Sequence, residues 1–334
     1  MKTFPKTLAL LSGVALLASS AIAQSVATDP VGYVTISVPA GSDVTAAFPM
    51  HPAPSYVGAV DSVSLVSGNQ YSIALSGSPS LAVNDFADPA APHFVRVDDG
   101  IDAGMSLTIL SNSSDAIVVE LEGGDSVAAI ESGTTLSLIP YWTAKSLIGD
   151  APNNFQMLLY GTDVAGTNLA SSSILIFANG DWYDSVTGGL SNDLIIHPEE
   201  SVVLRNSTTE GVDLIVSGSV PMVAHRVALS TLSANAPQDI RVAYNSPTET
   251  IISEAGFENM NNNDQLLVFD NSLVATNKAA SQILIFANGA WYDSVTGSDV
   301  SLTFKLMPGH GYVFRKAATV EPETILWKDT QSYN

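Results

Sequence analysis

The sequence contains a nearly perfect internal copy of one segment. Residues 174–188 read ILIFANGDWYDSVTG and residues 283–297 read ILIFANGAWYDSVTG, so fourteen of fifteen positions are identical at a spacing of 109 residues. The likeness continues into residues 198–205 (PEESVVLR) and 308–315 (PGHGYVFR). A segment repeated at a fixed spacing indicates a structural unit that occurs more than once. The fold must therefore provide the same local structure in at least two places.

A fainter third copy lies upstream of these two. Phe94-Val95-Arg96 stands 109 residues before Val203-Leu204-Arg205, and both are followed by a polar stretch and another strand-like run. A length of 334 residues has room for two to three domains. The sequence therefore predicts three tandem β units after a signal peptide, the first of them divergent. The expected divisions are residues 1–23, 24–116, 117–225 and 226–334.

An Asn-Gly pair interrupts each copy at the same point, as Asn179-Gly180 and Asn288-Gly289. Asn-Gly between two apolar runs is the strongest short signal for a two-residue β-hairpin. Such a turn places Phe177 opposite Trp182 and Ile176 opposite Tyr183, with the same register in the other copy. Because the run ILIFA is apolar on both faces, we expect the hairpin to be central in its sheet and covered on both sides.

The rest of the chain also favours β structure. Short apolar runs bounded by Gly, Asn, Asp or Pro have the length and spacing of sandwich strands, and helical patterns are confined to residues 143–148 and 251–257. The chain has no cysteine, so disulfides do not support the fold and each unit must rely on its own hydrophobic core. We expect an all-β protein of tandem β-sandwich-like units.

The N-terminal residues have the pattern of a secretory signal peptide. Lys2 and Lys6 lead into an apolar run at residues 8–18, and Ala21-Ile22-Ala23 matches a small-x-small cleavage site. The chain carries 12 Lys+Arg against 33 Asp+Glu, a net charge of −21. Such a chain repels phosphate backbones, which excludes nucleic acid as a partner. No second apolar run is long enough for a transmembrane segment, and we expect a secreted or cell-surface location, with the periplasm as the alternative.

Several segments together carry a resemblance to a known family. They are Thr28-Asp-Pro-Val-Gly-Tyr-Val-Thr, Ile139-Pro-Tyr-Trp-Thr, Leu266-Leu-Val-Phe-Asp-Asn and Gly311-Tyr-Val-Phe-Arg-Lys. The chain resembles an uncharacterised family of secreted β-rich proteins from Verrucomicrobia and related bacteria, over nearly all of its mature length. The resemblance implies secretion and assigns no enzyme activity, ligand or catalytic residue. The chain departs from the family at residues 174–177 and 180–182, where the family has an aromatic-rich strand and a Gly-Trp pair.

The most distinctive candidate ligand site is the aromatic and acidic segment that follows each Asn-Gly turn. An exposed Trp or Tyr ring beside a carboxylate can stack a sugar and accept its hydroxyls, and two copies would add avidity. The alternative, which we favour, is that the tryptophans pair with phenylalanines across the hairpin inside the core while the aspartates bond to a nearby turn. The candidate residues are Trp182, Tyr183, Asp184, Trp291, Tyr292 and Asp293.

Metal and catalytic patterns are weaker. Asn259-x-Asn261-x-Asn263 and Asp98-Asp99-Gly100 are oxygen-rich loops that leave room for weak Ca²⁺ binding, although the first departs from a calcium loop at three positions. The metal site is thus unknown, and we expect no other cofactor. The five histidines show no HxH or HExxH spacing, and no nucleophile motif is present. One arginine in each expected unit, Arg96, Arg205 or Arg315, stands at the end of a strand, which favours a structural ion pair with a nearby carboxylate.

These observations favour an exported, non-catalytic structural, surface or adhesive protein. A carbohydrate-binding array that uses the Trp-Tyr-Asp hairpins is the first alternative. A secreted hydrolase is the second, because paired carboxylates from distant strands leave no local motif, and the sequence leaves enzyme activity undecided. The candidate partners are a second copy of the chain, through open sheet edges, and an extracellular glycan.

Overall fold

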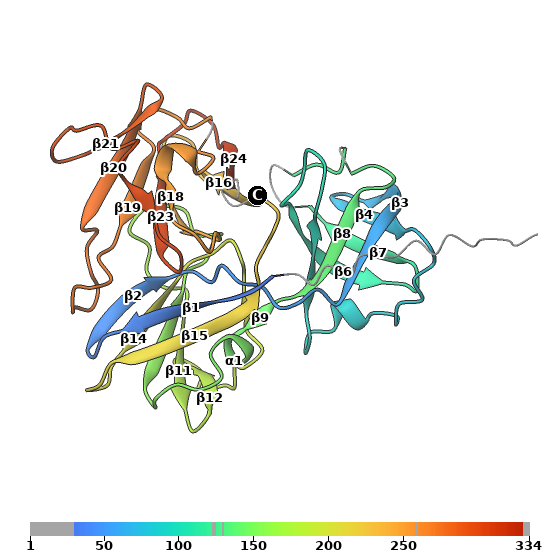
Figure 1. Ribbon diagram of the computed structural model, residues 1–334, viewed down its shortest axis with the longest axis horizontal. Coiled ribbons are helices and arrows are strands. Elements are labelled where there is room, and N and C mark those ends of the chain that lie inside the picture. The colour runs from blue at the N-terminus through green and yellow to red at the C-terminus, as the bar shows by residue number, and fades with distance from the viewer. Residues whose placement is uncertain (1–29, 122–124, 129, 258, 330–334) are drawn as a thin grey trace, which may run out of the picture.

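The computed structural model describes residues 30–121, 125–128, 130–257 and 259–329. The expected signal peptide, residues 1–23, lies outside the described residues. The described chain is all-β, with one short α-helix and two 3₁₀ turns. Figure 1 shows three bodies: a barrel formed by residues 56–140, and two sheet-built units that lie side by side next to it. None of the helices formed by described residues has the length and apolar character needed to span a membrane.

The barrel is a closed sheet of six strands in the order β3-β4-β7-β6-β5-β8. Its interior is filled by aliphatic side chains, among them Val60, Ile73, Leu107 and Leu136, which are buried. Closure removes the open sheet edges that would otherwise invite pairing with other chains. Its elements are β3 (Tyr56–Ser67), β4 (Gln70–Leu75), η1 (Asp85–Ala87), β5 (His93–Val97), β6 (Ser106–Asn112), β7 (Ala116–Glu120) and β8 (Thr135–Pro140).

The second body, here named the split unit, is made from chain on both sides of the barrel. A five-stranded sheet in the order β12-β11-β10-β14-β2 packs against the ribbon β1-β15, and a short pair β13-β9 closes one end. Its elements are β1 (Val31–Val38), β2 (Ser42–Ala46), β9 (Trp142–Thr143), α1 (Ala144–Leu147), β10 (Phe155–Leu159), β11 (Ser173–Ala178), β12 (Asp181–Asp184), β13 (Ile195–Ile196), β14 (Val202–Asn206) and β15 (Val212–Ser219).

The third body, here named the C-terminal unit, is continuous in the chain. Its five-stranded sheet has the order β17-β23-β19-β20-β21, with a ribbon β16-β24 and a short pair β18-β22. Its elements are β16 (His225–Ser230), β17 (Gln238–Ala243), β18 (Thr250–Ile251), η2 (Ile252–Glu254), β19 (Gln265–Val268), β20 (Gln282–Ala287), β21 (Ala290–Asp293), β22 (Lys305–Leu306), β23 (Gly311–Lys316) and β24 (Thr324–Asp329).

The split unit and the C-terminal unit have the same strand order. Read from the hairpin edge, β12-β11-β10-β14-β2 matches β21-β20-β19-β23-β17, and the ribbons β1-β15 and β16-β24 match as well. One difference is the connection after the second strand. In the C-terminal unit a short turn joins β17 to β18, whereas in the split unit the whole barrel stands between β2 and β9. The barrel is therefore an insertion into one of two like-folded units.

This arrangement corrects the predicted division of the chain. The boundary expected between residues 116 and 117 falls inside barrel strand β7, whereas the one expected between 225 and 226 lies one residue into β16 and nearly coincides with the division between the two sheet-built units. Phe94–Arg96 does not belong to a third unit of the same strand order, because β5 pairs with β6 and β8 in the barrel. A three-residue match is short enough to occur in unrelated strands. The split unit was not predicted because its strands β1 and β15 pair across a long stretch of chain, and such pairing leaves no local sequence pattern.

The predicted hairpins are confirmed with their register. Phe177 pairs with Trp182 and Ile176 with Tyr183, and Phe286 pairs with Trp291 in the other copy. Asn179 and Asn288 both adopt positive φ, as the tight turn requires. The expectation that the hairpin is central in its sheet is wrong, since β12 and β21 are edge strands. The predicted helical turns appear as α1 and η2.

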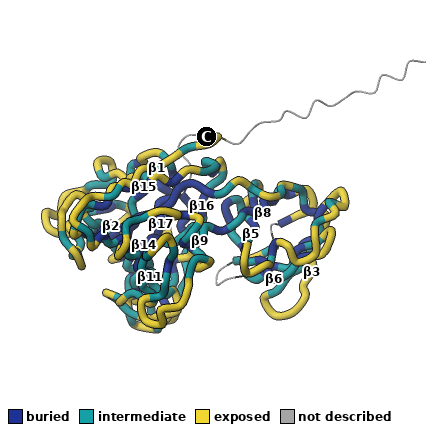
Figure 2. The backbone as a smooth tube through the Cα atoms, turned by 90° about the horizontal axis from the view of Figure 1, so that it is seen from below, coloured by how far each residue is buried: buried dark blue, intermediate teal, exposed yellow. Residues whose placement is uncertain are grey.

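Each body has its own hydrophobic core, as a chain without cysteine requires. Figure 2 shows buried backbone inside the barrel and inside the sheet-built units, with exposed residues gathered at the outer loops. A small apolar cluster of Phe94, Ile139 and Tyr141, with Ile195 packed against it, joins the barrel to the split unit. Arg226 at the start of the C-terminal unit is bonded to barrel residue Asp102 at 2.9 Å. The barrel therefore contacts both of the other bodies.

Candidate functional site

The two tryptophans of the repeated hairpins lie in the cores. Trp182 is 0% exposed and Trp291 is 2% exposed. The Trp182 ring meets Phe177 edge-on at 5.2 Å between centroids, and Trp291 meets Phe286 in the same way at 5.3 Å. The Trp182 indole N–H donates to the carbonyl of Ile148 at 2.9 Å. Neither indole offers a face to a sugar, and both rings contribute to the packing of the sheet.

The aspartates of the same segments organise turns. The Asp184 carboxylate accepts hydrogen bonds from the backbone N–H of Val186 and Thr187, and Asp293 does the same for Val295 and Thr296. These bonds, strongest from the threonine, lower the pKa of Asp184 and lower that of Asp293 to about 2. Tyr183 and Tyr292 are half-buried on the opposite sheet face from the tryptophans.

The strand-end arginines form ion pairs with aspartates, as predicted. Arg96 pairs with Asp98 at 2.7 Å. Arg205 on β14 bonds both carboxylate oxygens of Asp43 on β2, at 2.7 and 2.8 Å. Arg315 on β23 bonds both oxygens of Asp239 on β17, at 2.6 and 2.9 Å. Hydrogen bonding to Asp43 and to Asp239 raises the pKa of Arg205 and of Arg315, respectively.

Each of the last two pairs also holds a loop of the other unit. We name residues 160–172 and 269–281, which join matching strands, the crossing loops. Asn277 of one crossing loop donates its backbone N–H to Asp43 at 2.6 Å and accepts from Arg205 through its side chain at 2.7 Å. Asn168 of the other loop makes the corresponding contacts, at 2.7 Å to Asp239 and 3.1 Å to Arg315. The two units therefore exchange loops reciprocally.

Backbone hydrogen bonds repeat the same exchange. The N–H of Asp43 donates to the carbonyl of Ala275, and the N–H of Asp239 donates to the carbonyl of Gly166, both at 2.9 Å. Strands β2 and β17 are edge strands of their sheets, so each crossing loop supplies partners to an edge that would otherwise be open. A rotation by half a turn would superimpose one set of contacts on the other, as at an isologous interface between two subunits.

The approximate twofold axis passes near Ser201 and Gly311, which are matching residues. The Ser201 hydroxyl donates to the carbonyl of Tyr312 at 3.3 Å. A Cβ on Gly311 would overlap the Ser201 side chain and lie 2.9 Å from Cγ2 of Thr45. Gly311 is therefore required by close approach of the two units rather than by its backbone angles.

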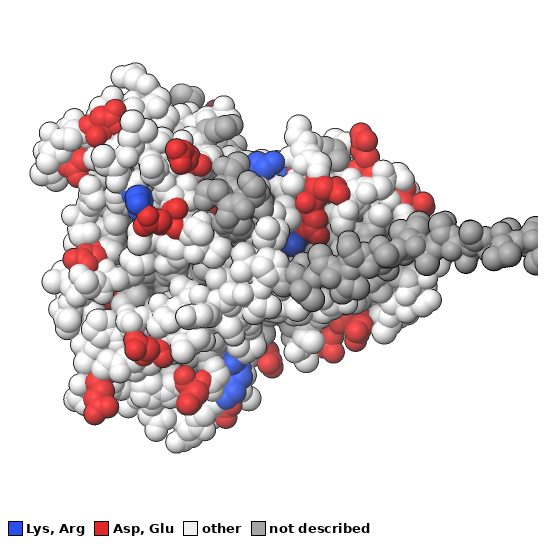
Figure 3. Space-filling view, in the orientation of Figure 1, with Lys and Arg blue, Asp and Glu red and all other residues white. Residues whose placement is uncertain are grey.

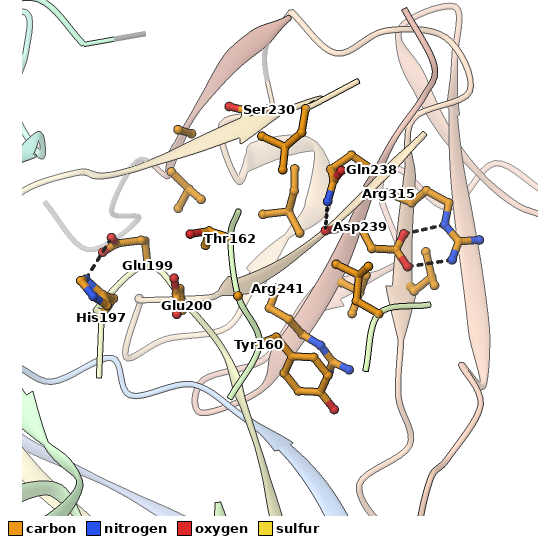
Figure 4. A pocket seen from close by; sticks show the side chains of 18 of the residues that line it. Tyr160, Thr162, His197, Glu199, Glu200, Ser230, Gln238, Asp239, Arg241 and Arg315 are labelled. Carbon is orange, nitrogen blue, oxygen red and sulfur yellow. Dashed lines mark hydrogen bonds and ion pairs between the residues drawn. The ribbon is translucent and has the colours of Figure 1, made fainter. Parts of the chain in front are cut away.

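A cavity of about 1040 Å³ lies where the split unit, the C-terminal unit and the barrel meet. It is bounded by the start of both crossing loops, by the outer face of β17, β23 and β19, and by β16. Apolar lining residues include Leu169, Leu267 and Val313. Figure 4 shows His197, Glu199 and Glu200 on one side of this space, Asp239 and Arg315 on the other, and Arg241 beside Tyr160 between them. The four acidic and four basic residues that line it are Asp125, Glu199, Glu200, Asp239, Arg226, Arg241, Lys278 and Arg315.

Arg241 lies close to two aromatic rings. Its guanidinium carbon lies 3.9 Å from the centroid of Tyr160 and 5.6 Å from that of Phe269, the first residues of the two crossing loops. Its Nη1 atom is buried with no hydrogen-bond partner among the described residues. Burial lowers the pKa of Arg241, while the nearby Tyr160 and Asp239 act in the opposite direction.

The oxygen-rich loops have protein partners for their oxygens. Asp264 accepts backbone hydrogen bonds from Asn261 and Ala317, both at 2.8 Å, and Asp98 is bonded to Arg96 and Ser137. Among the described residues, no group of three or more His, Asp or Glu side chains converges as a metal site would require. His197 lies 3.7 Å from the carboxylate of Glu199 in the wall of the cavity.

Searches of protein-family models, of curated proteins and of solved structures give no match to this chain. Sequence reasoning found Arg205 and Arg315 but missed Arg241, which lies outside the segment of high identity. The sequence did hold one signal. Arg241 stands two positions after Asp239, and the position two after Asp43 in the other unit is Thr45, so an arginine replaces a threonine at matching positions.

Proposed function

We propose that the protein is an exported, non-catalytic structural or surface protein whose body is a pair of interlocked β units. One observation carries this proposal: the most distinctive repeated residues are used to hold the molecule together. Trp182 and Trp291 fill the cores, and the aspartates paired with Arg205 and Arg315 anchor the crossing loops. Such a body resists separation of its units without disulfides, which suits a protein that works outside the cytoplasm.

The surface supports the same proposal. Acidic side chains are spread over all three bodies with few basic ones between them, as Figure 3 shows for one face. Like charges of this density keep copies of the protein apart in solution and favour a hydrated surface. The charged fraction is only 13%, so uncharged polar residues must cover much of the exterior. The N-terminal signal pattern and the resemblance to secreted proteins support export.

The internal likeness supports an origin by duplication. We propose two repeats, the split unit and the C-terminal unit, in place of three. Their matching strand order, hairpin register and crossing-loop contacts support this count. The barrel is then a later insertion between β2 and β9, whose chain leaves the split unit through a buried connection at residues 47–51.

Export and surface location are tested by expressing the full chain with its own N-terminus in a Gram-negative host and separating cytoplasm, periplasm, membranes and medium. We expect the protein outside the cytoplasm, with Gln24 as its N-terminal residue by Edman or mass-spectrometric sequencing. Protease added to intact cells then tells surface from periplasm. Recovery of uncleaved protein in the cytoplasm would contradict the proposal.

The hydrolase alternative retains one supporting observation, which is that Glu199 and Glu200 line a cavity large enough for a substrate. Hydrolysis of polysaccharide, ester or peptide substrates by the wild-type protein, lost in Glu199→Gln or Glu200→Gln, would favour it over the non-catalytic proposal. We expect no turnover above that of a heat-inactivated sample. The carbohydrate-binding alternative is not proposed for the hairpins, because stacking needs an exposed ring and both indoles are buried.

A further inference from the structure

We propose that the cavity between the two units binds a small carboxylic acid with an apolar body, and that the Arg241 guanidinium receives the carboxylate. This inference goes beyond the structural role proposed above, since a body of interlocked units needs no ligand. The β2 and β17 edges, which match in the two units, differ at the cavity.

At the β2 edge the space is closed by protein. Asn271 of the crossing loop accepts a hydrogen bond from the backbone N–H of Thr45 and donates to its carbonyl, both at 3.0 Å. The hollow left beside this contact has a volume of about 320 Å³ and is lined by Pro308, Gly309 and His310. The crossing loop thus continues the sheet through an asparagine side chain.

At the β17 edge the matching residues are different and the space is open. Arg241 stands in place of Thr45, Thr162 in place of Asn271, and Glu199 in place of Gly309. The cavity there has a volume of about 1040 Å³, which is the size of a site for a small organic molecule. The two units therefore match in strand order but differ in these residues, and the cavity lies at the β17 edge where they differ.

Arg241 differs from every other arginine of the chain. The chain has five arginines, all within the described residues, and four of them pair with an aspartate at 2.9 Å or less: Arg96, Arg205, Arg226 and Arg315. No ion pair joins Arg241 to a described carboxylate, and its Nη1 is buried without a hydrogen bond. A guanidinium stays charged in proteins, and a buried charge without a partner is unfavourable. An anionic ligand removes that cost.

The other residues that line the cavity determine which kind of anion fits beside Arg241. The guanidinium carbon lies 3.9 Å from the Tyr160 ring and 5.6 Å from the Phe269 ring. Contacts of this kind use the face of a guanidinium, and a planar, bidentate partner such as a carboxylate binds its edge. Leu267, Ile283 and Val313 give the wall beyond it an apolar surface that suits an aryl or alkyl group. The carboxylates of Glu199 and Glu200 disfavour a ligand with several negative charges.

The test uses the purified mature protein and sodium phenylacetate, with 2-phenylethanol as the uncharged analogue and inorganic phosphate as the second anion. Binding is followed by NMR of ¹⁵N-arginine-labelled protein, in which each of the five arginines gives one Nε–H signal. We expect phenylacetate to move one signal with saturation, and 2-phenylethanol to bind about ten- to a hundredfold more weakly, since a charge-assisted hydrogen bond is lost. The signal that moves should be absent in Arg241→Met.

Two variants separate binding from folding. Arg241→Met should weaken phenylacetate binding about ten- to a hundredfold, whereas Lys305→Met, which removes an exposed charge paired with Glu249, should leave it unchanged. The double variant Arg241→Thr with Thr162→Asn copies the closed β2 edge and should abolish binding while keeping the fold. The proposal is overturned if phenylacetate shows no saturable shift up to about 20 mM, if 2-phenylethanol or phosphate alone binds as well, or if the signal that moves persists in Arg241→Met.

Discussion

The β2 edge and the β17 edge are matching parts of the two units, and they share one set of contacts and differ in another. Both keep an aspartate bound by an arginine and by the backbone N–H of the asparagine of a crossing loop. Two residues further along, Thr45 is closed over by Asn271, whereas Arg241 opens onto a cavity. The shared set is therefore what the interlock of the two units requires, and the positions that differ have been free to acquire another role.

The ribbons show a second difference of this kind. In the ribbon β1-β15, Gly32 pairs with Gly218, and a Cβ on Gly218 would overlap the carbonyl of His51. At the corresponding end of the ribbon β16-β24, His225 pairs with Asp329. Burial lowers the pKa of His225 to about 3 and raises that of Asp329 to about 7. The ribbon of the split unit thus has glycines beside the buried His51, whose pKa burial also lowers, whereas the ribbon of the C-terminal unit itself buries two titratable groups.

The largest expected effect comes from the shared hairpins. Trp182→Ala and Trp291→Ala should each lower the free energy of unfolding by about 3–5 kcal/mol, because each removes a fully buried indole. Similar losses in the two units are expected, since the two sites match. Urea unfolding followed by circular dichroism measures them, with the half-buried Tyr183→Ala as the control for a change in the same strand. A tryptophan variant as stable as the wild type would show that the ring is not part of the core.

A substitution at the axis tests the contact between the units. Gly311→Ala should lower the free energy of unfolding by about 2 kcal/mol, because the new Cβ overlaps Ser201 of the other unit. The double variant Gly311→Ala with Ser201→Gly removes the overlapping group and should recover part of the loss. Thermal unfolding of the two single variants and the double variant measures the coupling. Strictly additive effects would contradict direct contact between these residues.

The buried His225 of the C-terminal unit predicts a pH dependence of stability. With a folded-state pKa of about 3, the neutral ring of His225 contributes stability that is complete above the unfolded-state pKa near 6.5 and is lost as pH falls toward 3. The loss is about 2 kcal/mol at pH 5. Asp329, whose pKa burial raises to about 7, contributes in the opposite direction in both proteins, so the change in stability from pH 7 to pH 5 should be more favourable in His225→Gln than in the wild type by about this amount.

Urea midpoints at pH 7, 6 and 5 test the pH prediction. His197→Gln serves as the control, because that ring is 38% exposed in the wall of the cavity. If His225→Gln and the wild-type protein lose stability in parallel over this range, the histidine is not held neutral by the fold.

The smallest expected change in stability comes from replacing Arg241, which has no ion pair, in contrast to Arg205, which is paired with Asp43. Without ligand, Arg241→Met should leave the free energy of unfolding within about 1 kcal/mol of the wild type or raise it, because an unpaired buried charge is removed. Arg205→Met should lower it by about 2 kcal/mol, because Asp43 loses a bidentate partner. Equal losses at the two positions would contradict the distinction between a structural and a ligand-facing arginine.

Whether a contact could be predicted from the sequence depended on how far apart in the chain its residues lie. The Phe177–Trp182 register could be predicted because an Asn-Gly turn determines it locally. That Arg205 would pair with an acidic residue could be predicted, but its partner Asp43 could not, since 162 residues separate them. The barrel insertion was not predicted because the sequence of Phe94–Arg96 resembles Val203–Arg205 and Val313–Arg315, although it belongs to a different fold. The cavity was missed because it forms only when the units dock.

Hydrogen–deuterium exchange of Asp239→Asn tests most directly whether the two units are interlocked by exchanged loops. Asp239 belongs to the C-terminal unit, yet its carboxylate and backbone hold Asn168 and Gly166 of the split unit. We predict faster amide exchange in residues 160–172, with the hairpin of residues 173–184 unchanged, and the reciprocal result in residues 269–281 for Asp43→Asn. Faster exchange confined to the unit that carries the substitution would contradict the interlock.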